Sequence, residues 1–407
     1  MREDRQETVL ARRDRREEAG TRTAWRPVSA VISDRLLTFV RCPDGHRGLE
    51  HREGAVLCGV CGRRFARTGG YLDLRPSDEF AEQTKYLDEA LHLDRRHETI
   101  SPPLLAAAVR NDMLRAMLAP APGDRVVDLG CGSGRVLLWN RDLGAYQVGI
   151  DVSPFFAGEA CTFVDLVLGD LRRLPFGDAA FNKAYALDVL EHLSRESLTE
   201  VLREAARVLD PGGWLFVYSH VRKNSRLAYG LRLTNRLAGR LERLGLLDLR
   251  QERLRKSDHL NPLADIPDLE RVVAEAGFRI ARIRYYTPMI GGVVENILVR
   301  LAERAMTRRA ARREAPLPGS EPRPAGEEQQ GTAHVEVAHK VRTEAKERIA
   351  RRGPSYAGLV ALTWLMKLDV VLLGRVRSGP FFALLEKREP VARTSGAGVD
   401  RAPAGSA

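Results

Sequence analysis

The residues best suited to chemistry in this sequence lie around three glycines that follow a short apolar run. Residues 126–129 are mostly β-prone and apolar, which predicts a buried strand. Gly130, Gly132 and Gly134 come directly after it and keep side chains out of a tight turn. Apolar residues resume at Val136, so a helix is expected to begin within the turn. The sequence thus predicts a strand, a turn whose bare backbone can approach a ligand, and a helix.

Acidic residues follow the next predicted strands where a nucleoside ligand would need them. The apolar run 148–150 ends at Asp151, about 20 residues beyond the first glycine, the distance at which a carboxylate holds a ribose diol in nucleotide-binding folds. A third run, 163–168, leads to Asp170. The glycine spacing does not fit a dinucleotide fingerprint, because Arg135 stands where that motif needs its third small residue.

Strand-like and helical runs alternate through this region and must position those groups. A fourth apolar run ends at Asp188, and a helix with apolar residues at three-to-four spacing is expected from Ser194 until the turn at 210–213. A fifth strand over 214–218 leads to His220. Strands with polar carboxyl ends, separated by helices, predict a doubly wound sheet whose ligand crevice lies at those ends.

The ordered motifs resemble those of class I S-adenosylmethionine (SAM) methyltransferases, in particular the subgroup of ubiquinone and menaquinone biosynthesis. The turn Gly-Cys-Gly-Ser-Gly over 130–134 resembles motif I, and Asp-Val-Leu-Glu-His over 188–192 resembles motif IV. The resemblance implies an α/β fold with a doubly wound, Rossmann-like, seven-stranded sheet, and SAM as the cofactor. Asp128 would lie near the amino-acid end of SAM, Asp151 at its ribose and Asp170 at its adenine amine. The implied cofactor-binding residues are Asp128, Gly130, Cys131, Gly132, Gly134, Asp151, Val152, Asp170, Leu171 and Leu187.

Methyl transfer from a sulfonium mainly needs an aligned nucleophile, with a base when the acceptor is a hydroxyl group. His220 is the first candidate for that base, because it ends a strand on the ligand side. His192 and Asp188, which follow the fourth strand, are the other catalytic candidates. A substrate-positioning role for His220 is the alternative.

Residues 34–76 resemble the small zinc-ribbon domain that accompanies many methyltransferases. Such ribbons begin with Cys-x2-Cys, whereas position 45 here is glycine. The set Cys42, His46, Cys58 and Cys61 supplies four donors that suit tetrahedral zinc. A metal-free ribbon held together by packing is the alternative.

The amino-acid composition limits which binding partners and which cell compartment are expected. A formal charge of +11 over 407 residues favours an anionic partner, which could be nucleic acid, a lipid surface or a phosphorylated substrate. Five cysteines without a framework of pairs suit a reducing compartment, and the charged N-terminus has no apolar core of a signal peptide. We therefore expect a cytoplasmic protein, peripheral to the inner face of the membrane if it binds lipid. Charged disordered tails are predicted at 1–33 and 391–407, around a methyltransferase domain at 77–288 whose last strand lies at 378–390.

Residues 289–377 form a predicted helical, partly disordered insertion before the last strand. Its stretch 356–373 is nearly long enough to span a bilayer, but Lys367 and Asp369 would each cost about 2.5–3.5 kcal/mol at the bilayer centre. An in-plane helix on the membrane surface fits this composition better. Packing of the insertion on the sheet is the alternative.

These features predict a SAM-dependent methyltransferase that acts on a small-molecule or lipid-linked acceptor, with O-, C- and N-methylation all open. An RNA methyltransferase that uses the ribbon to hold nucleic acid is the alternative. No Asn/Asp-Pro-Pro-Tyr/Phe base-methylation motif follows the fourth strand, which argues against RNA.

Overall fold

The computed structural model describes residues 32–76, 100–223, 228–247, 259–286, 289–302, 304–305 and 353–389. The predicted tail at 1–33, apart from its last two residues, lies outside the described residues, as do the tail at 391–407 and the middle of the insertion at 306–352.

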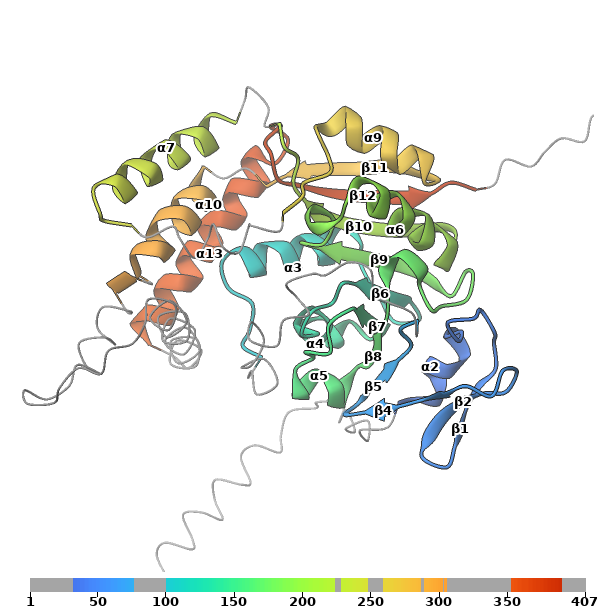
Figure 1. Ribbon diagram of the computed structural model, residues 1–407. Helices are drawn as coiled ribbons and strands as arrows, with labels where there is room; N and C mark the ends of the chain where they lie inside the picture. The colour runs from blue at the N-terminus through green and yellow to red at the C-terminus, as the bar shows by residue number, and fades with distance from the viewer. Residues whose placement is uncertain are drawn as a thin grey trace, which may run out of the picture.

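A nine-stranded sheet forms the centre of the molecule, in the order β11-β12-β10-β9-β6-β7-β8-β5-β4 (Figure 1). Neighbouring strands from β10 to β5 are parallel, and β12 runs antiparallel to both β10 and β11. This confirms the doubly wound fold: the seven predicted strands are present, and two from the N-terminal segment extend their sheet. The strands are β4 (Arg67–Thr68), β5 (Tyr71–Asp73), β6 (Arg125–Leu129), β7 (Tyr146–Asp151), β8 (Asp165–Leu168), β9 (Phe181–Leu187), β10 (Leu209–Ser219), β11 (Phe278–Tyr285) and β12 (Phe381–Lys387).

The order places a topological switch point at β6. The chain proceeds from β6 to β7 and β8 on one side, and then returns to pair β9 on the other side of β6. Connections that leave a strand in opposite directions open a crevice at its carboxyl end, where open α/β sheets bind ligands. The glycine turn after β6 is at this point.

Helices cover both faces of the sheet, and each face has its own apolar core. One core packs α6 and α9 together with the N-terminal segment, and the other packs α3, α4, α5 and α13. These helices are α3 (Ala106–Met117), α4 (Arg135–Trp139), α5 (Gly158–Phe163), α6 (Arg195–Val208), α9 (Ile266–Glu275) and α13 (Pro354–Leu373). Short 3-10 turns lie at Arg141–Leu143, Leu171–Arg173 and Leu190–His192.

The N-terminal segment is built into the main fold rather than beside it. Its own sheet is β1 (Leu49–Arg52), β2 (Ala55–Cys58) and β3 (Arg64–Phe65), preceded by α2 (Asp34–Phe39). Its last hairpin, β4–β5, instead joins the large sheet through parallel pairing of β5 with β8. Ser33 also bonds to Asp165 at the start of β8. The predicted unit 34–76 thus shares one hydrophobic core with the sheet.

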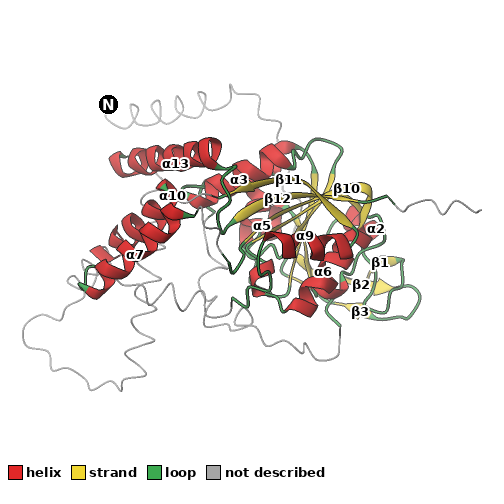
Figure 2. Ribbon diagram, turned by 90° about the horizontal axis from the view of Figure 1, so that it is seen from above, coloured by secondary structure: helices red, strands yellow, loops and turns green. Residues whose placement is uncertain are grey.

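Three helical segments lie together at one side of the molecule, beyond α3 (Figures 1 and 2). They are α7 (Tyr229–Arg243), the continuous α10 (Ile290–Val293) and π-turn (Val294–Leu298), and α13. We call these three segments the helical layer. The N-terminal segment lies at the other side in both views.

Candidate active site

The glycine turn has the conformation that the sequence predicts, and each glycine has its own reason. Gly130, Gly132 and Gly134 all have positive φ, at 78°, 56° and 80°. A Cβ on Gly130 would lie 2.6 Å from Val189, and one on Gly134 would lie 2.7 Å from Ala160. A Cβ on Gly132 would meet nothing within 4 Å. Two of the glycines therefore allow close packing, whereas Gly132 keeps a space open.

Asp151 at the end of β7 fixes the turn. Its Oδ2 accepts a hydrogen bond from the Gly132 N–H at 2.8 Å, and its Oδ1 accepts one from the Ser153 N–H at 2.9 Å. The carboxylate is thereby oriented at the carboxyl edge of the sheet, as a ribose-binding acid must be. Val152 follows it directly in the loop before α5.

Asp128 is buried within β6, with 2% of its surface exposed. Burial raises the pKa of the carboxyl group well above its ordinary value, and the nearby Tyr185 hydroxyl opposes this rise. By geometry, neither Oδ2 of Asp128 nor that hydroxyl has a hydrogen-bond partner among the described residues. A buried, unpaired carboxylate oxygen calls for a donor, and a cationic one serves it best. The α-ammonium group of SAM is such a donor, so the site fits this cofactor.

A cavity of about 270 Å³ lies between α3, the glycine turn and the end of β9. Of the predicted cofactor residues, Asp128, Gly130, Cys131, Gly132 and Leu187 line it, and the predicted catalytic Asp188 does so too. Small-molecule sites commonly have about 300–1,000 Å³, so this cavity is near the lower end of that range.

The adenine side of the predicted site differs from expectation. Both oxygens of Asp170 accept hydrogen bonds from Arg172, at 2.9 to 3.1 Å. Asp170 also accepts from the Arg172 N–H at the start of the 3-10 turn that contains Leu171. A contact of Asp170 with an adenine amine thus stays a prediction, and it requires the Arg172 side chain to share or release the carboxylate.

Asp188 is held in a left-handed backbone conformation, with φ 54°, at the end of β9. Its carboxylate accepts a hydrogen bond from Arg110 of α3 at 2.7 Å, and the Arg110 guanidinium lies 5.1 Å from the centre of the Tyr218 ring. Burial raises the pKa of Asp188, and the positive charge of Arg110 opposes this rise. Non-glycine residues with positive φ are uncommon and cluster at functional sites.

His220 and Glu191 form a pair beside Asp188. Nδ1 of His220 lies 3.4 Å from Oε1 of Glu191, and Ser219 donates a hydrogen bond to the other Glu191 oxygen at 2.8 Å. Glu191 is 1% exposed, whereas His220 is about a third exposed. Burial raises the pKa of Glu191, but the contact with His220 outweighs it and leaves that pKa below its ordinary value. Glu191 and His220 are therefore within ion-pair distance, although His220 Nδ1 makes no hydrogen bond among the described residues.

His192 is linked to this pair through the ring of His259. Its ring meets that of His259 edge to face at 4.6 Å, and the His259 ring is 6.4 Å from that of His220. The structure thus gathers all three predicted catalytic residues at neighbouring strand ends. Ligand atoms of Asp188, Glu191 and His220 lie within 4.8 Å of one another.

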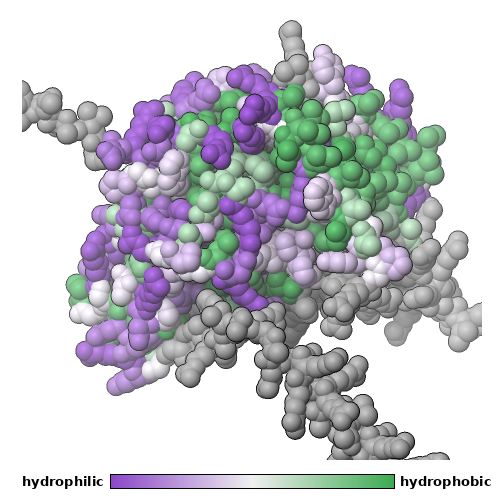
Figure 3. All heavy atoms as spheres, turned by 180° about the vertical axis from the view of Figure 1, so that it is seen from behind, coloured by the Kyte–Doolittle hydropathy of each residue, from purple (hydrophilic) through white to green (hydrophobic). Residues whose placement is uncertain are grey.

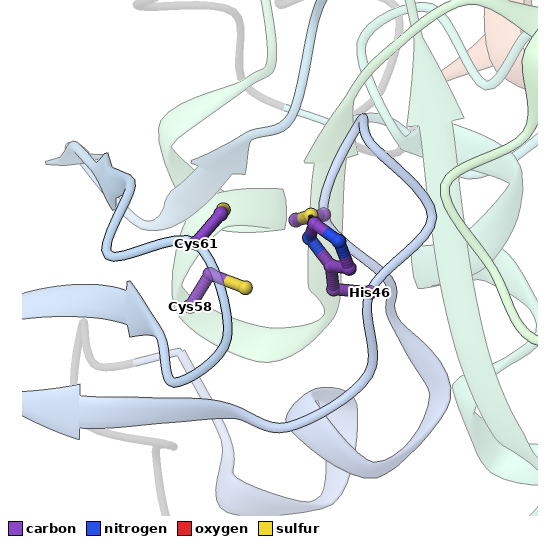
Figure 4. Close-up of side chains that lie close together, drawn as sticks. His46, Cys58 and Cys61 are labelled. Carbon is purple, nitrogen blue, oxygen red and sulfur yellow. Dashed lines mark hydrogen bonds between the residues drawn. The ribbon is translucent and has the colours of Figure 1, made fainter.

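Four donors converge in the N-terminal segment as predicted for zinc. Cys42, His46, Cys58 and Cys61 offer ligand atoms within 4.8 Å of one another, and Figure 4 shows His46, Cys58 and Cys61 directed toward a common point. Zn–S and Zn–N bonds of about 2.0–2.3 Å place tetrahedral ligands at comparable separations. Gly45, where a second cysteine was expected, has φ 86° and makes the turn that carries His46 back to within 3.2 Å of Cys42.

Arg110 is the site residue that the sequence did not reveal. It lies within α3, and it lines the cavity together with Asn111 and Trp139. The only signal in the sequence is an arginine inside the apolar periodicity of 104–118. The sequence of that helix does not indicate that Arg110 pairs with Asp188.

Comparison with known proteins agrees with this geometry. Residues 127–217 match the family model described as a methyltransferase domain. A sterol 4-C-methyltransferase of Caenorhabditis elegans is 33% identical over 110 residues, which are 24% of this chain and 31% of that protein. A 27-O-demethylrifamycin SV methyltransferase of Amycolatopsis mediterranei is 32% identical over 114 residues, 26% of this chain and 41% of that protein.

A probable tRNA methyltransferase 9B of Mus musculus is 33% identical over 99 residues, 24% of this chain and 22% of that protein. In each of these three cases the matched part spans less than half of the relative.

The strand order, the glycine turn and the acids at the switch point define a class I, SAM-dependent methyltransferase fold. The part of this chain that matches the methyltransferase-domain model, residues 127–217, contains the glycine turn, Asp151 and Asp188.

Proposed function

We propose that the protein transfers a methyl group from SAM to a small-molecule acceptor that His220 deprotonates or orients. The observation that carries this proposal is the position of Asp188. It lines the cofactor-type cavity and also lies within 4.8 Å of the His220–Glu191 pair, so the two halves of a transfer reaction adjoin.

The residues have distinct roles in this proposal. SAM supplies an electrophilic methyl group, which needs only an aligned nucleophile. Asp128 and the amide backbone of the turn bind the amino-acid end, and Asp151 binds the ribose. Arg110 and Asp188 close the boundary between cofactor and acceptor. His220 accepts a proton at Nε2 when the acceptor is a hydroxyl group, and Glu191 keeps its ring in place.

The surface of the N-terminal segment supports a small acceptor over RNA. Four of its arginines already lie within ion-pair distance of carboxylates: Arg41 with Asp178, Arg52 with Glu50, Arg63 with Asp44, and Arg64 with Glu53. Binding of a nucleic acid depends on cations that can neutralise phosphates. The relatives named for sterol and rifamycin methylation point the same way, whereas the relative named for tRNA keeps RNA as the second candidate.

The acceptor class can be determined with the full-length protein and SAM labelled in its methyl group. The protein is incubated with separate extracts of lipids, water-soluble metabolites and small RNA, and label is counted in each. We expect label in the lipid or metabolite fraction. Label in RNA alone would contradict a small-molecule acceptor. An Asp151→Ala variant, which loses the turn's anchor, is the matched control and should transfer much less label when SAM is kept below its dissociation constant.

A further inference from the structure

The helical layer exposes an apolar surface that the proposed reaction does not use. On α13 the most exposed large side chains are Trp364, Leu365, Leu368, Val371 and Leu372, and Trp364 and Val371 are 69% and 79% exposed. Figure 3 shows hydrophobic atoms gathered on the side of the molecule where the helical layer lies. Soluble monomers rarely expose contiguous apolar patches of this kind without a partner.

α7 carries a second apolar stripe of its own. Leu233, Leu237 and Leu244 recur at helical spacing and are 70%, 44% and 71% exposed. The residues on the buried side of the same helix are Thr234 and Ala238. The α7 stripe therefore faces away from the protein.

Both charged side chains of α13 turn toward the protein. Lys367 pairs with Asp112 of α3 at 2.5 Å. Asp369 is 3% exposed and accepts hydrogen bonds from the backbone N–H groups of Met289, Ile290 and Gly291 at 3.2 to 3.5 Å. The cost that these charges would impose on contact with lipid is thereby removed from the outer face.

α13 is also the one helix among the described residues that is long and apolar enough to cross a membrane. Its window Tyr356–Leu373 has a mean hydropathy of 1.7, and 22% of that window is buried, unlike a core helix. The helix is nevertheless tied to the enzyme along its length. Thr363 accepts a hydrogen bond from the Leu105 N–H, and the Tyr285 N–H donates one to the carbonyl of Gly374, the residue directly after α13. These contacts fix one side of the helix to the enzyme and leave its other side exposed.

Cations border the apolar surface. Arg375 and Arg377 are exposed directly after α13, and Arg236, Arg240 and Arg243 are exposed on α7 beside its leucines. Arginines around an apolar stripe complement a surface that is anionic outside and apolar within, which describes a bilayer of acidic phospholipids. A second copy of this chain would instead bring like charges together across a symmetric contact.

We propose that the helical layer docks in the plane of an anionic lipid bilayer, with the exposed face of α13 in the interface and the flanking arginines at the lipid phosphates. α3 packs against α13 on one side and carries Arg110 into the cavity on another. Docking would thus bring the mouth of the site close to the membrane. The proposal concerns the surface and holds for either class of small acceptor.

The test is flotation of the full-length protein with vesicles of phosphatidylcholine plus phosphatidylglycerol, and with vesicles of phosphatidylcholine alone. We expect binding to the first kind, weaker binding to the second, and a decrease with added salt. The double variant Trp364→Glu/Val371→Glu changes only exposed side chains and should lose at least about tenfold in partitioning. Val60→Glu is the matched control, because Val60 is 67% exposed in the N-terminal segment, and it should bind as the parent does.

Light scattering and SAM affinity are measured on the same samples. Unchanged SAM affinity of the double variant shows that it is folded, and it separates a failure of docking from a failure of the proposed function. The proposal is overturned if the parent protein binds neither kind of vesicle. That result would follow, for example, if a second copy of the chain or residues 306–352 covered the exposed face. Equal binding of the parent and the double variant overturns it as well.

Discussion

At the scale of single residues, the site depends on carboxylates that hold backbone or side chains rather than on isolated reactive groups. Asp151 binds two backbone N–H groups of the turn and its exit, and Glu191 binds Ser219 and His220. In the proposed function, each of these acids positions a neighbour for a ligand. Removal of one should therefore affect a binding or catalytic constant more than it affects folding.

Asp151→Ala should weaken SAM binding. The variant loses the proposed ribose contact, and a hydrogen bond to a charged group contributes about 1.5–3 kcal/mol, so we expect at least ~10-fold weaker affinity in calorimetry. Asp142→Ala is the control, because that carboxylate is largely exposed and pairs with Arg115 away from the turn. Retained affinity in Asp151→Ala would contradict the assignment of the pocket.

His220→Ala should slow methyl transfer to a hydroxyl acceptor by about 10²-fold or more, since a positioned base contributes that much. Glu191→Gln should give a smaller loss, and the double variant should be no slower than His220→Ala, because Glu191 acts through the histidine. SAM affinity, measured by calorimetry, should stay constant in all three. If the loss of rate in the double variant equals the product of the two single losses, Glu191 acts independently of His220.

At the scale of elements, the same glycine turn combines packing and binding. Gly130 faces Val189 after β9, whereas Gly132 faces open space. The two positions share a positive φ, so an alanine at either one is strained by about 1–2 kcal/mol. A difference in stability or SAM affinity between the two alanine variants therefore reports the room around each new methyl group.

Gly130→Ala should be the less stable of the two variants, because its new methyl group would meet Val189 at 2.6 Å. Gly132→Ala should fold more stably and yet lose SAM affinity, since its methyl group enters the cavity. Thermal unfolding and calorimetry on both variants check this pair. If both lose equal stability and keep their affinity, the turn does not contact the cofactor.

Asp268 links α9 to α6 and gives the fold a pH dependence. It accepts hydrogen bonds from Arg195, Arg271 and the Ala264 N–H, and these lower its pKa well below the ordinary value despite the opposing effect of burial. A depressed folded pKa means that this stabilisation is complete above about pH 4 and is lost as the pH falls further. Urea unfolding should show that loss in the parent and a flatter profile in Asp268→Asn. The free energy of unfolding at neutral pH should also fall in the variant, by about 2 kcal/mol.

Much of this arrangement is readable from local sequence. The strand ends, the glycine turn and the zinc donors appear as short motifs, and they lie where the motifs predict. Three other features cannot be read from local sequence, because each depends on residues far away in the chain. They are the pairing of β5 with β8, the contact of Arg110 with Asp188, and the inward direction of Lys367 and Asp369. Periodicity reports which face is apolar, but it does not report which distant group meets a charge.

At the scale of the whole molecule, the four converging donors lie in a segment that shares its core with the sheet. Purified protein should contain about one zinc per chain by elemental analysis, as a closed four-ligand site does. Cys61→Ser should lower that content and also the melting temperature of the entire domain. Protein that is fully folded without zinc would show that packing alone holds the segment.

The position of β12 has a consequence for how the chain is made. The last strand that the structure describes is not at an edge: it lies between β10 and β11, and among the described strands β11 pairs with β12 alone. A ribosome must therefore release residues 381–387 before the sheet can close. Until then β10 presents an unpaired apolar edge. A premature stop codon shortly before Phe381 would leave a product prone to aggregate, rather than an enzyme that lacks only its tail.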